Sequence, residues 1–127
     1  MNLLVLRNTY SIYSFINTSE LPNWIYSSDF YSITRSEDEL SVVAIQNLST
    51  PTNVKSDPGW RILKIAGPLD FSLIGIIAEI SAILKEKNIL IFVISTFETD
   101  FILVKNGSLK SAIDTLINKG HIVTTQH

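Results

Sequence analysis

The chain has 127 residues, 46% hydrophobic and 17% charged, enough to bury the core of one domain or of two very small domains. Its net charge is −2, and its Lys and Arg residues form no run that could build the basic face of a nucleic-acid-binding protein. The absence of cysteine excludes disulfides, thiolate metal sites and thiol catalysis, and it fits a reducing cytoplasm.

The hydrophobic stretches of the chain are too short or too interrupted to cross a membrane. The N-terminal sequence "MNLLVLRNTY" lacks the basic flank and long apolar core of a signal peptide. The most apolar region, residues 73–94, is broken by Glu79 and by "KEKN" at 85–88, which is typical of a helix followed by a strand. We therefore expect a cytoplasmic protein with neither a membrane nor a nucleic acid as partner.

The first half of the chain reads as short, irregular elements. Strands are predicted at residues 3–7, 11–16, 30–35 and 41–46, a short helical or turn segment limited by Pro22 at 18–24, and a turn or short helix at 36–40. Residues 49–59 have the Ser, Thr, Asn, Pro and Gly composition of a linker. We place the domain boundary there, between an N-terminal half at 1–55 and a C-terminal domain at 56–127.

The second half is more regular. "WRILKIA" (60–66) predicts a strand, and from Ser72 an apolar stripe at helical spacing predicts a helix that Asp70 or Ser72 caps and Asn88 ends in a left-handed conformation. A strand at 89–96, a tight connection at 98–100, a strand at 101–105, a helix between Gly107 and Gly120 and a strand at 121–125 follow. The order β-α-β-β-α-β predicts an α+β, ferredoxin-like fold, an antiparallel sheet with helices on one face.

The predicted strand "ILIFVI" does not alternate between apolar and polar residues. A sheet covered by helices on one side alone should show such alternation. We therefore expect the first half of the chain, or a second copy of it, to cover the other face or extend the sheet. The alternative is a strand that is merely rich in Ile.

Few residues suggest catalysis. His121 and His127 stand apart from any cluster at metal-ligand spacing, and we expect both to be surface or terminal residues. A nucleophile elbow, a Walker loop and a dinucleotide fingerprint are absent from the sequence. We expect a non-enzymatic protein without a metal or cofactor.

Asp100, between the predicted strands at 89–96 and 101–105, has two interpretations: a turn residue, or a carboxylate that pairs with a ligand's amine or guanidinium.

Four segments together resemble a known family: "GPLDFSLIGII" (67–77), "ISTFETDFILVK" (94–105), "LKSAI" (109–113) and "GH" (120–121). They resemble the ACT domain, and more narrowly the branch shared by small bacterial tandem-ACT proteins and the cytosolic arginine sensors called CASTOR. The resemblance runs from Trp60 to Ile122. "FYSITRSEDELSVV" (30–43) also resembles the first half of that branch, so the N-terminal half is expected to be a degenerate ACT-like unit.

The resemblance implies a regulatory rather than catalytic protein, whose ACT units pair side by side and bind an amino acid at the seam. Carried over to this chain, the ligand-binding residues are Gly67, Pro68, Leu69, Asp70, Phe71 and Ser72 in the loop before the helix, and Thr96, Phe97, Thr99 and Asp100 at the corner after the next strand. In a homodimer, Asn88 and Ile89 of the second chain would complete the site.

This chain also departs from the family pattern. Asn88 replaces a small Gly or Ser, and Thr99 replaces an aromatic residue of the arginine sensors, so arginine itself is not implied. The sensors have four ACT units and this chain at most two, so a complete seam is expected to need a homodimer. The free N–H groups of the helix after Asp70 would suit a ligand carboxylate, and Asp70 and Asp100 its ammonium. Alternatively, Leu73 and Phe71 fill the seam, and the module is purely structural or serves protein interaction.

Overall fold

The computed structural model describes residues 1–49, 53–66 and 75–127. The chain forms two compact units: unit 1 combines Met1–Arg7 with Arg61–His127, and unit 2 is Asn8–Trp60. This division differs from the predicted boundary between residues 55 and 56, because the first residues of the chain join the C-terminal part. Among the described residues, no helix is long and apolar enough to cross a membrane.

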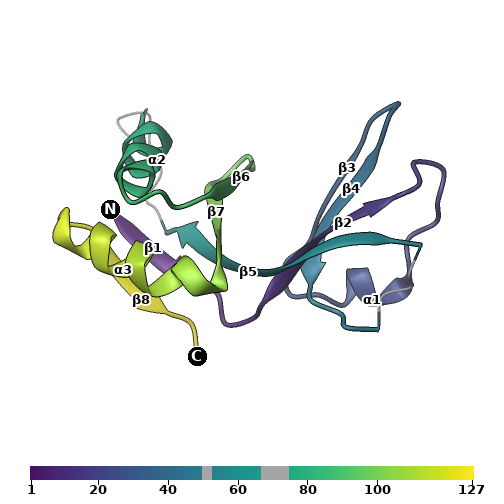
Figure 1. Ribbon diagram of the computed structural model, residues 1–127, viewed down its shortest axis with the longest axis horizontal. Helices are drawn as coiled ribbons and strands as arrows, with labels where there is room; N and C mark the ends of the chain where they lie inside the picture. Colours follow the sequence, from purple (N-terminus) through teal and green to yellow (C-terminus); the bar gives the residue numbers. More distant parts are fainter. Residues whose placement is uncertain (50–52, 67–74) are drawn as a thin grey trace. The chain divides into compact units, whose positions relative to one another are not determined.

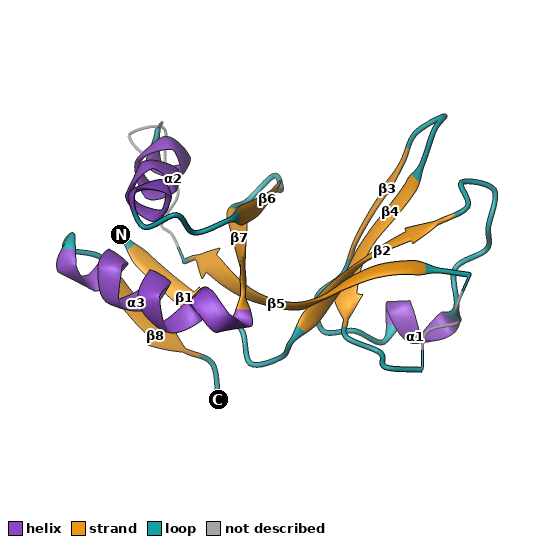
Figure 2. Ribbon diagram, viewed as in Figure 1, coloured by secondary structure: helices purple, strands orange, loops and turns teal. Residues whose placement is uncertain are grey.

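Unit 1 is the predicted ferredoxin-like βαββαβ unit (Figures 1 and 2). Its elements are β1 (Asn2–Val5), residues 61–65 of β5 (Lys55–Ile65), α2 (Ile76–Glu86), β6 (Ile91–Ser95), β7 (Asp100–Lys105), the 3-10 turn η2 (Asn106–Ser108), α3 (Leu109–Asn118) and β8 (Ile122–Thr125). From β5 onward, the order β-α-β-β-α-β confirms the fold expected from the sequence.

The N-terminal strand β1 lies inside the sheet of unit 1, whose strand order is β6-β7-β5-β1-β8. It pairs antiparallel with β5, with Leu3 opposite Ile65, and parallel with β8, with Leu3 opposite Val123. The predicted domain boundary had placed this strand in the N-terminal half. Its place follows from its apolar side chains, because Leu3 and Val5 are both 1% exposed in the core of unit 1.

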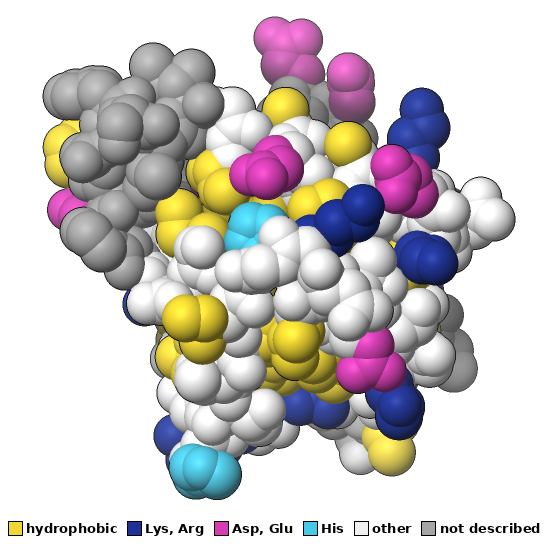
Figure 3. Space-filling model, turned by 90° about the vertical axis from the view of Figure 1, so that its left-hand side faces the viewer, with side chains coloured by type: hydrophobic (Ala, Val, Ile, Leu, Met, Phe, Trp, Pro, Cys, Tyr) yellow, Lys and Arg dark blue, Asp and Glu magenta, His cyan; other side chains and the backbone are white. Residues whose placement is uncertain are grey.

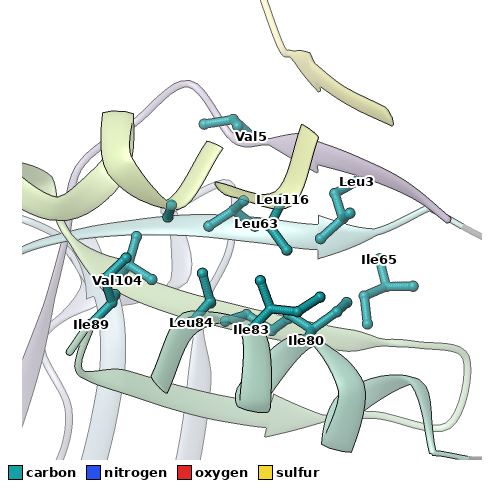
Figure 4. Close-up of a cluster of buried hydrophobic side chains, with 12 residues drawn as sticks. Leu3, Val5, Leu63, Ile65, Ile80, Ile83, Leu84, Ile89, Val104 and Leu116 are labelled. Carbon is teal, nitrogen blue, oxygen red and sulfur yellow. The ribbon is translucent and has the colours of Figure 1, made fainter. Parts of the chain in front are cut away.

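Both long helices cover the same face of the unit 1 sheet, as predicted (Figure 4). One continuous cluster of buried side chains joins them to the strands: Leu3, Val5, Leu63, Ile65, Ile80, Ile83, Leu84, Ile89, Ile102, Val104, Ala112 and Leu116. In Figure 4, Leu3, Ile65 and Ile80 lie toward one end of this cluster, and Ile89 and Val104 toward the other. The helices therefore span the sheet along its strands.

The C-terminal ends of both helices are as predicted, whereas α2 begins at Ile76 with Gly75 as its N-cap, and the predicted caps Asp70 and Ser72 lie outside the described residues. Asn88 takes the left-handed conformation, with φ 57°, and the Ile89 N–H donates to the Leu84 carbonyl at 3.1 Å. Gly120 has φ 94° after α3 and turns the chain toward β8. His121 then becomes 7% exposed, which corrects the expectation of a surface histidine. Its N–H is held by the Leu116 carbonyl, so its position belongs to the helix-ending turn.

Unit 2 is a smaller version of the same arrangement. It contains β2 (Tyr10–Phe15), α1 (Asn23–Tyr26), β3 (Ser32–Arg35), β4 (Leu40–Ile45) and the first part of β5, in the sheet order β3-β4-β2-β5. The helix between its first two strands has four residues, and the described residues between β4 and β5 contain no second helix. Apart from β1, unit 2 thus has the strand order of unit 1 with a much shorter first helix, and its assignment as a degenerate ACT-like half stays a prediction.

The predicted linker at 49–59 is partly a strand. Residues 55–59 belong to β5, and Lys55 pairs with Ser14 of β2 while Asp57 pairs with Ile12. The register shifts between Tyr10 and Ile12, an irregularity of the kind that lets a strand accommodate Pro58 and a glycine. The Ser, Thr, Asn, Pro and Gly composition of this segment is typical of a linker. Composition carries no information on the pairing with β2, which makes residues 55–59 a strand.

The core of unit 2 is aromatic. The Tyr13 ring lies edge-on to Trp24 with centroids 5.3 Å apart, and both pack with Ile25 beside the sheet. The Tyr13 hydroxyl donates to the Ile45 carbonyl at 2.9 Å and accepts the Asn47 N–H at 2.8 Å. Trp24 is therefore a packing residue of unit 2.

Candidate functional site

The predicted ligand-binding residues fall into three groups. Gly67, Pro68, Leu69, Asp70, Phe71 and Ser72 lie outside the described residues. Thr96, Phe97, Thr99 and Asp100 lie at the turn between β6 and β7, while Asn88 and Ile89 precede β6. The described part of the candidate site is thus distributed at the two ends of one strand.

The turn between β6 and β7 is closed by its own hydrogen bonds. The Thr96 N–H donates to the Thr99 carbonyl at 2.8 Å, and the Thr96 hydroxyl donates to the same oxygen at 3.0 Å. In return, the Thr99 N–H donates to Thr96 Oγ1 at 3.3 Å. These three bonds hold the corner in one conformation before any ligand is present, which reduces the entropy lost on binding.

A fourth hydrogen bond attaches this turn to the middle of the sheet. The Thr99 hydroxyl, in a residue 8% exposed, donates to the Ile65 carbonyl at 2.5 Å. Ile65 is the last residue of β5, just before the chain enters residues 67–74. The corner is therefore anchored at the carboxyl end of β5.

The four corner residues differ in what they can offer a ligand. The Thr99 hydroxyl is engaged within the fold, so its role there is structural. Phe97 is fully exposed, with a relative exposure of 101%, and Asp100 is half-buried as the first residue of β7, opposite Ser95. Phe97 and Asp100 are therefore the corner side chains that can contact a molecule outside the unit.

We predict that Thr99→Val loosens the corner. The substitution leaves the Ile65 carbonyl without its hydroxyl donor, and an unsatisfied buried acceptor costs about 1–3 kcal/mol of unfolding free energy. Urea unfolding measures the loss, and Thr34→Val on the exposed face of β3 is the matched control, expected to change stability by less than about 0.5 kcal/mol. Equal stability of Thr99→Val and the parent would show that the hydrogen bond does not hold the corner.

Asn88 and Ile89 lie at the other end of β6. The Ile89 side chain is 8% exposed within the unit 1 core, so it can offer a ligand only its backbone. Leu90 and the five residues of β6 separate Ile89 from Thr96, and the five strand residues alone span roughly 17 Å at about 3.3 Å per residue. Within one unit, the structure does not bring the two predicted groups together.

Other chemistry is sparse in the described residues. They contain no group of three or more His, Asp or Glu side chains that could hold a metal ion. Both ring nitrogens of His121 are buried without a hydrogen-bond partner in the part of the chain that the structure describes. On the face drawn in Figure 3, Lys and Arg side chains alternate with Asp and Glu, and hydrophobic patches lie between them, so neither sign of charge dominates this face.

A groove that the sequence analysis missed runs beside α3. Its volume is about 590 Å³, and apart from a glycine the residues that line it are of polar or charged types: Glu86, Lys87, Gly107, Lys110, Ser111, Asp114, Thr115, Asn118 and Lys119. These residues come from the end of α2 and from the length of η2 and α3. The polar positions of a helical pattern predict a solvated helix face, so only the packing of α2 beside α3 reveals the groove.

This chain is similar to a known protein family and to several solved structures. A family model described as the ACT domain matches residues 55–118, and a model of an N-terminal domain matches residues 8–51. A search of curated proteins finds no match. The crystal structure of protein Atu0741 from Agobacterium tumefaciens is 36% identical, with a TM-score of 0.89 over 99% of this chain and 93% of that one.

Two more distant structures share the fold. Protein VC0802 from Vibrio cholerae is 16% identical, with a TM-score of 0.71 over 92% of this chain and 88% of its own. The regulatory subunit of aspartate kinase from Thermus thermophilus is 12% identical, with a TM-score of 0.60 over 87% of this chain and 92% of its own. Given the family model over residues 55–118 and the 36% identity to Atu0741 over nearly its full length, this chain belongs to the ACT-domain family.

Proposed function

We propose that this protein is a non-catalytic regulatory module of the cytoplasm, of the branch related to the CASTOR sensors, and that it binds an amino acid at a seam between ACT units of two copies. The observation that supports the proposal most directly is the hydrogen bond from the Thr99 hydroxyl to the Ile65 carbonyl. It fixes a rigid corner, with an available carboxylate at Asp100, at the end of β5, where the chain leads into residues 67–74.

A second copy would complete the site. Among the described strands, β6 pairs with β7 alone, so it is an edge strand of the unit 1 sheet. If two β6 strands from different copies align antiparallel about a two-fold axis, the start of one lies beside the end of the other. Asn88 and Ile89 of the second copy then lie beside Phe97 and Asp100 of the first. Such pairing would also cover part of a strand whose first four residues are only half-buried.

The available groups suit an α-amino acid. Its ammonium needs an acceptor, which the Asp100 carboxylate offers, and its carboxylate needs N–H donors such as backbone groups near the start of α2. Binding of this kind requires neither a nucleophile nor a metal. An amino acid would thus change the free energy of pairing between two copies, which is how a small module can regulate.

A second candidate function has its own support. Phe97 in the β6–β7 turn is 101% exposed and Leu90, just before β6, is 67% exposed. Exposed apolar side chains at both ends of an edge strand favour burial against another protein chain. In this alternative, the same surfaces join two chains as a structural or protein-interaction module, and no ligand enters the seam.

Thermal-shift screening of the twenty amino acids separates the two candidates. A ligand at about 100 times its Kd stabilises the folded protein by about 2.7 kcal/mol, so the melting temperature should rise by several degrees for one amino acid. Asp100→Ala should abolish that rise, and the exposed Asp38→Ala in unit 2 should keep it. If no amino acid at millimolar concentration shifts the transition, the ligand-binding proposal fails and the structural module remains.

The seam itself has a separate test. Sedimentation equilibrium at tens of micromolar should show a dimer, and the amino acid found by thermal shift should tighten it. A monomer both with and without that amino acid would contradict the pairing of two copies. If Asp100→Ala retains the thermal shift, the ligand binds elsewhere on the protein.

A further inference from the structure

We propose that the groove along α3 is a second binding site, for a small organic anion that carries at least two carboxylate or phosphate groups. Its volume of about 590 Å³ falls within the range of about 300–1,000 Å³ typical of small-molecule sites. All of its lining residues belong to unit 1. It shares no residue with the proposed amino-acid seam, so it goes beyond the function proposed above.

The lining covers one whole side of α3. Gly107, Ser111 and Thr115 are spaced by four residues, as are Lys110, Asp114 and Asn118, and residues at this spacing lie on one side of a helix. Glu86 and Lys87, at the end of α2, form the opposite wall. From Lys110 to Lys119 the helix rises by roughly 14 Å at about 1.5 Å per residue, so the groove can hold an elongated molecule with charges at two places.

The charge of the groove is opposite to that of the whole chain. Three lysines and two acids line it, which gives a net charge of +1, whereas the chain carries −2. Asp114 is already neutralised by Lys110, whose Nζ lies 3.1 Å from Asp114 Oδ2. Within the residues that the structure describes, Lys87 and Lys119 form no ion pair, so two ammonium groups remain for a ligand. The Glu86 carboxylate repels an anionic group placed beside it. The groove therefore favours ligands whose negative groups lie near Lys87 and Lys119.

The groove also contains hydrogen-bond donors for anionic oxygens. Thr115 lines the groove, although the residue is only 7% exposed. Ser111 and Asn118 add a hydroxyl and an amide beside it. The two ammonium groups of Lys87 and Lys119, together with these hydroxyl and amide groups, favour an anion as the ligand.

Chemical-shift titration of the full-length, ¹⁵N-labelled chain tests the site, with citrate and pyrophosphate as probes and acetate and glycerol as controls. We expect amide shifts confined to residues 86–87 and 107–119 with citrate or pyrophosphate. Thr115→Val should weaken binding about fivefold by removing a hydrogen bond, and Lys87→Gln and Lys119→Gln about tenfold each. Lys85→Gln, the same charge change on α2 outside the groove, should alter the Kd by less than about twofold.

The outcomes separate this site from the seam. Binding by both probes that is unchanged in Asp100→Ala and weakened in Lys119→Gln would support the groove, whatever the amino-acid screen shows. If neither probe shifts these amides up to about 10 mM, or if Lys85→Gln weakens binding as much as Lys119→Gln, the groove is not an anion site. Shifts centred on residues 96–100 would place the anion at the seam and would also overturn the inference.

Discussion

Removal of residues 2–7, with Met1 kept, should leave unit 1 unable to fold cooperatively. The deletion takes away β1, which lies between β5 and β8, and it exposes two strand edges inside the sheet. It also removes the buried side chains of Leu3, Val5 and Leu6. Burial of each such side chain contributes about 1.5–3 kcal/mol, so the loss is about 4.5–9 kcal/mol, comparable with the whole stability of many domains.

Urea unfolding followed by circular dichroism measures this loss, and an amide spectrum shows whether unit 1 signals keep their dispersion. Val5→Asp in the full-length chain should reproduce most of the effect, because it places a charge in the same core. Asn2→Ser is the matched control, since Asn2 is exposed on the same strand. An unchanged urea midpoint in the truncated chain would mean that unit 1 closes without β1.

Leu84→Ala should destabilise the protein by about 2–5 kcal/mol. Leu84 is 0% exposed and lies in the cluster of Figure 4, between the helices and the sheet, where the missing atoms leave a cavity that rigid strands cannot fill. The same cluster holds the α2 end of the groove and the β5 end of the corner in place. We therefore expect weaker binding at both proposed sites, as a consequence of lower stability.

The control for Leu84→Ala is Leu90→Ala, the same substitution at a residue 67% exposed. It should change the unfolding free energy of the monomer by less than about 0.5 kcal/mol. Denaturation at several protein concentrations also separates core from interface: Leu84→Ala should lower stability at every concentration, and Leu90→Ala only where two copies pair. Equal losses from both substitutions at low concentration would contradict the described packing of α2.

The residues of the corner after β6 have different roles. The Thr99 hydroxyl holds the corner against β5, and the side chains of Phe97 and Asp100 are available to contact a ligand or a second chain. The groove beside α3 is built from different residues of the same unit. Two ligands that bind one small folded unit influence each other through its stability, so an anion in the groove would be expected to change the affinity at the seam.

The sequence by itself was enough to predict the order of elements, the helical stripes and the C-terminal ends of the helices in the ACT unit. Those features depend on local chemistry: apolar residues recur with the period of a helix, and Asn88 and Gly120 adopt the left-handed conformation at the ends of the two helices. The same local chemistry identified the corner "STFETD", because turn residues there separate two apolar strands.

The tertiary structure decided which distant strands pair and what they bring together. The local pattern of β1 predicts a strand, but it does not predict that Leu3 lies opposite Ile65, or that residues 55–59 form a strand with β2. Strand pairing depends on the register and edges of segments far apart in the chain, and local periodicity carries no information on either. For the same physical reason, the hydrogen bond from Thr99 to Ile65 and the groove between α2 and α3 emerged only from the folded structure.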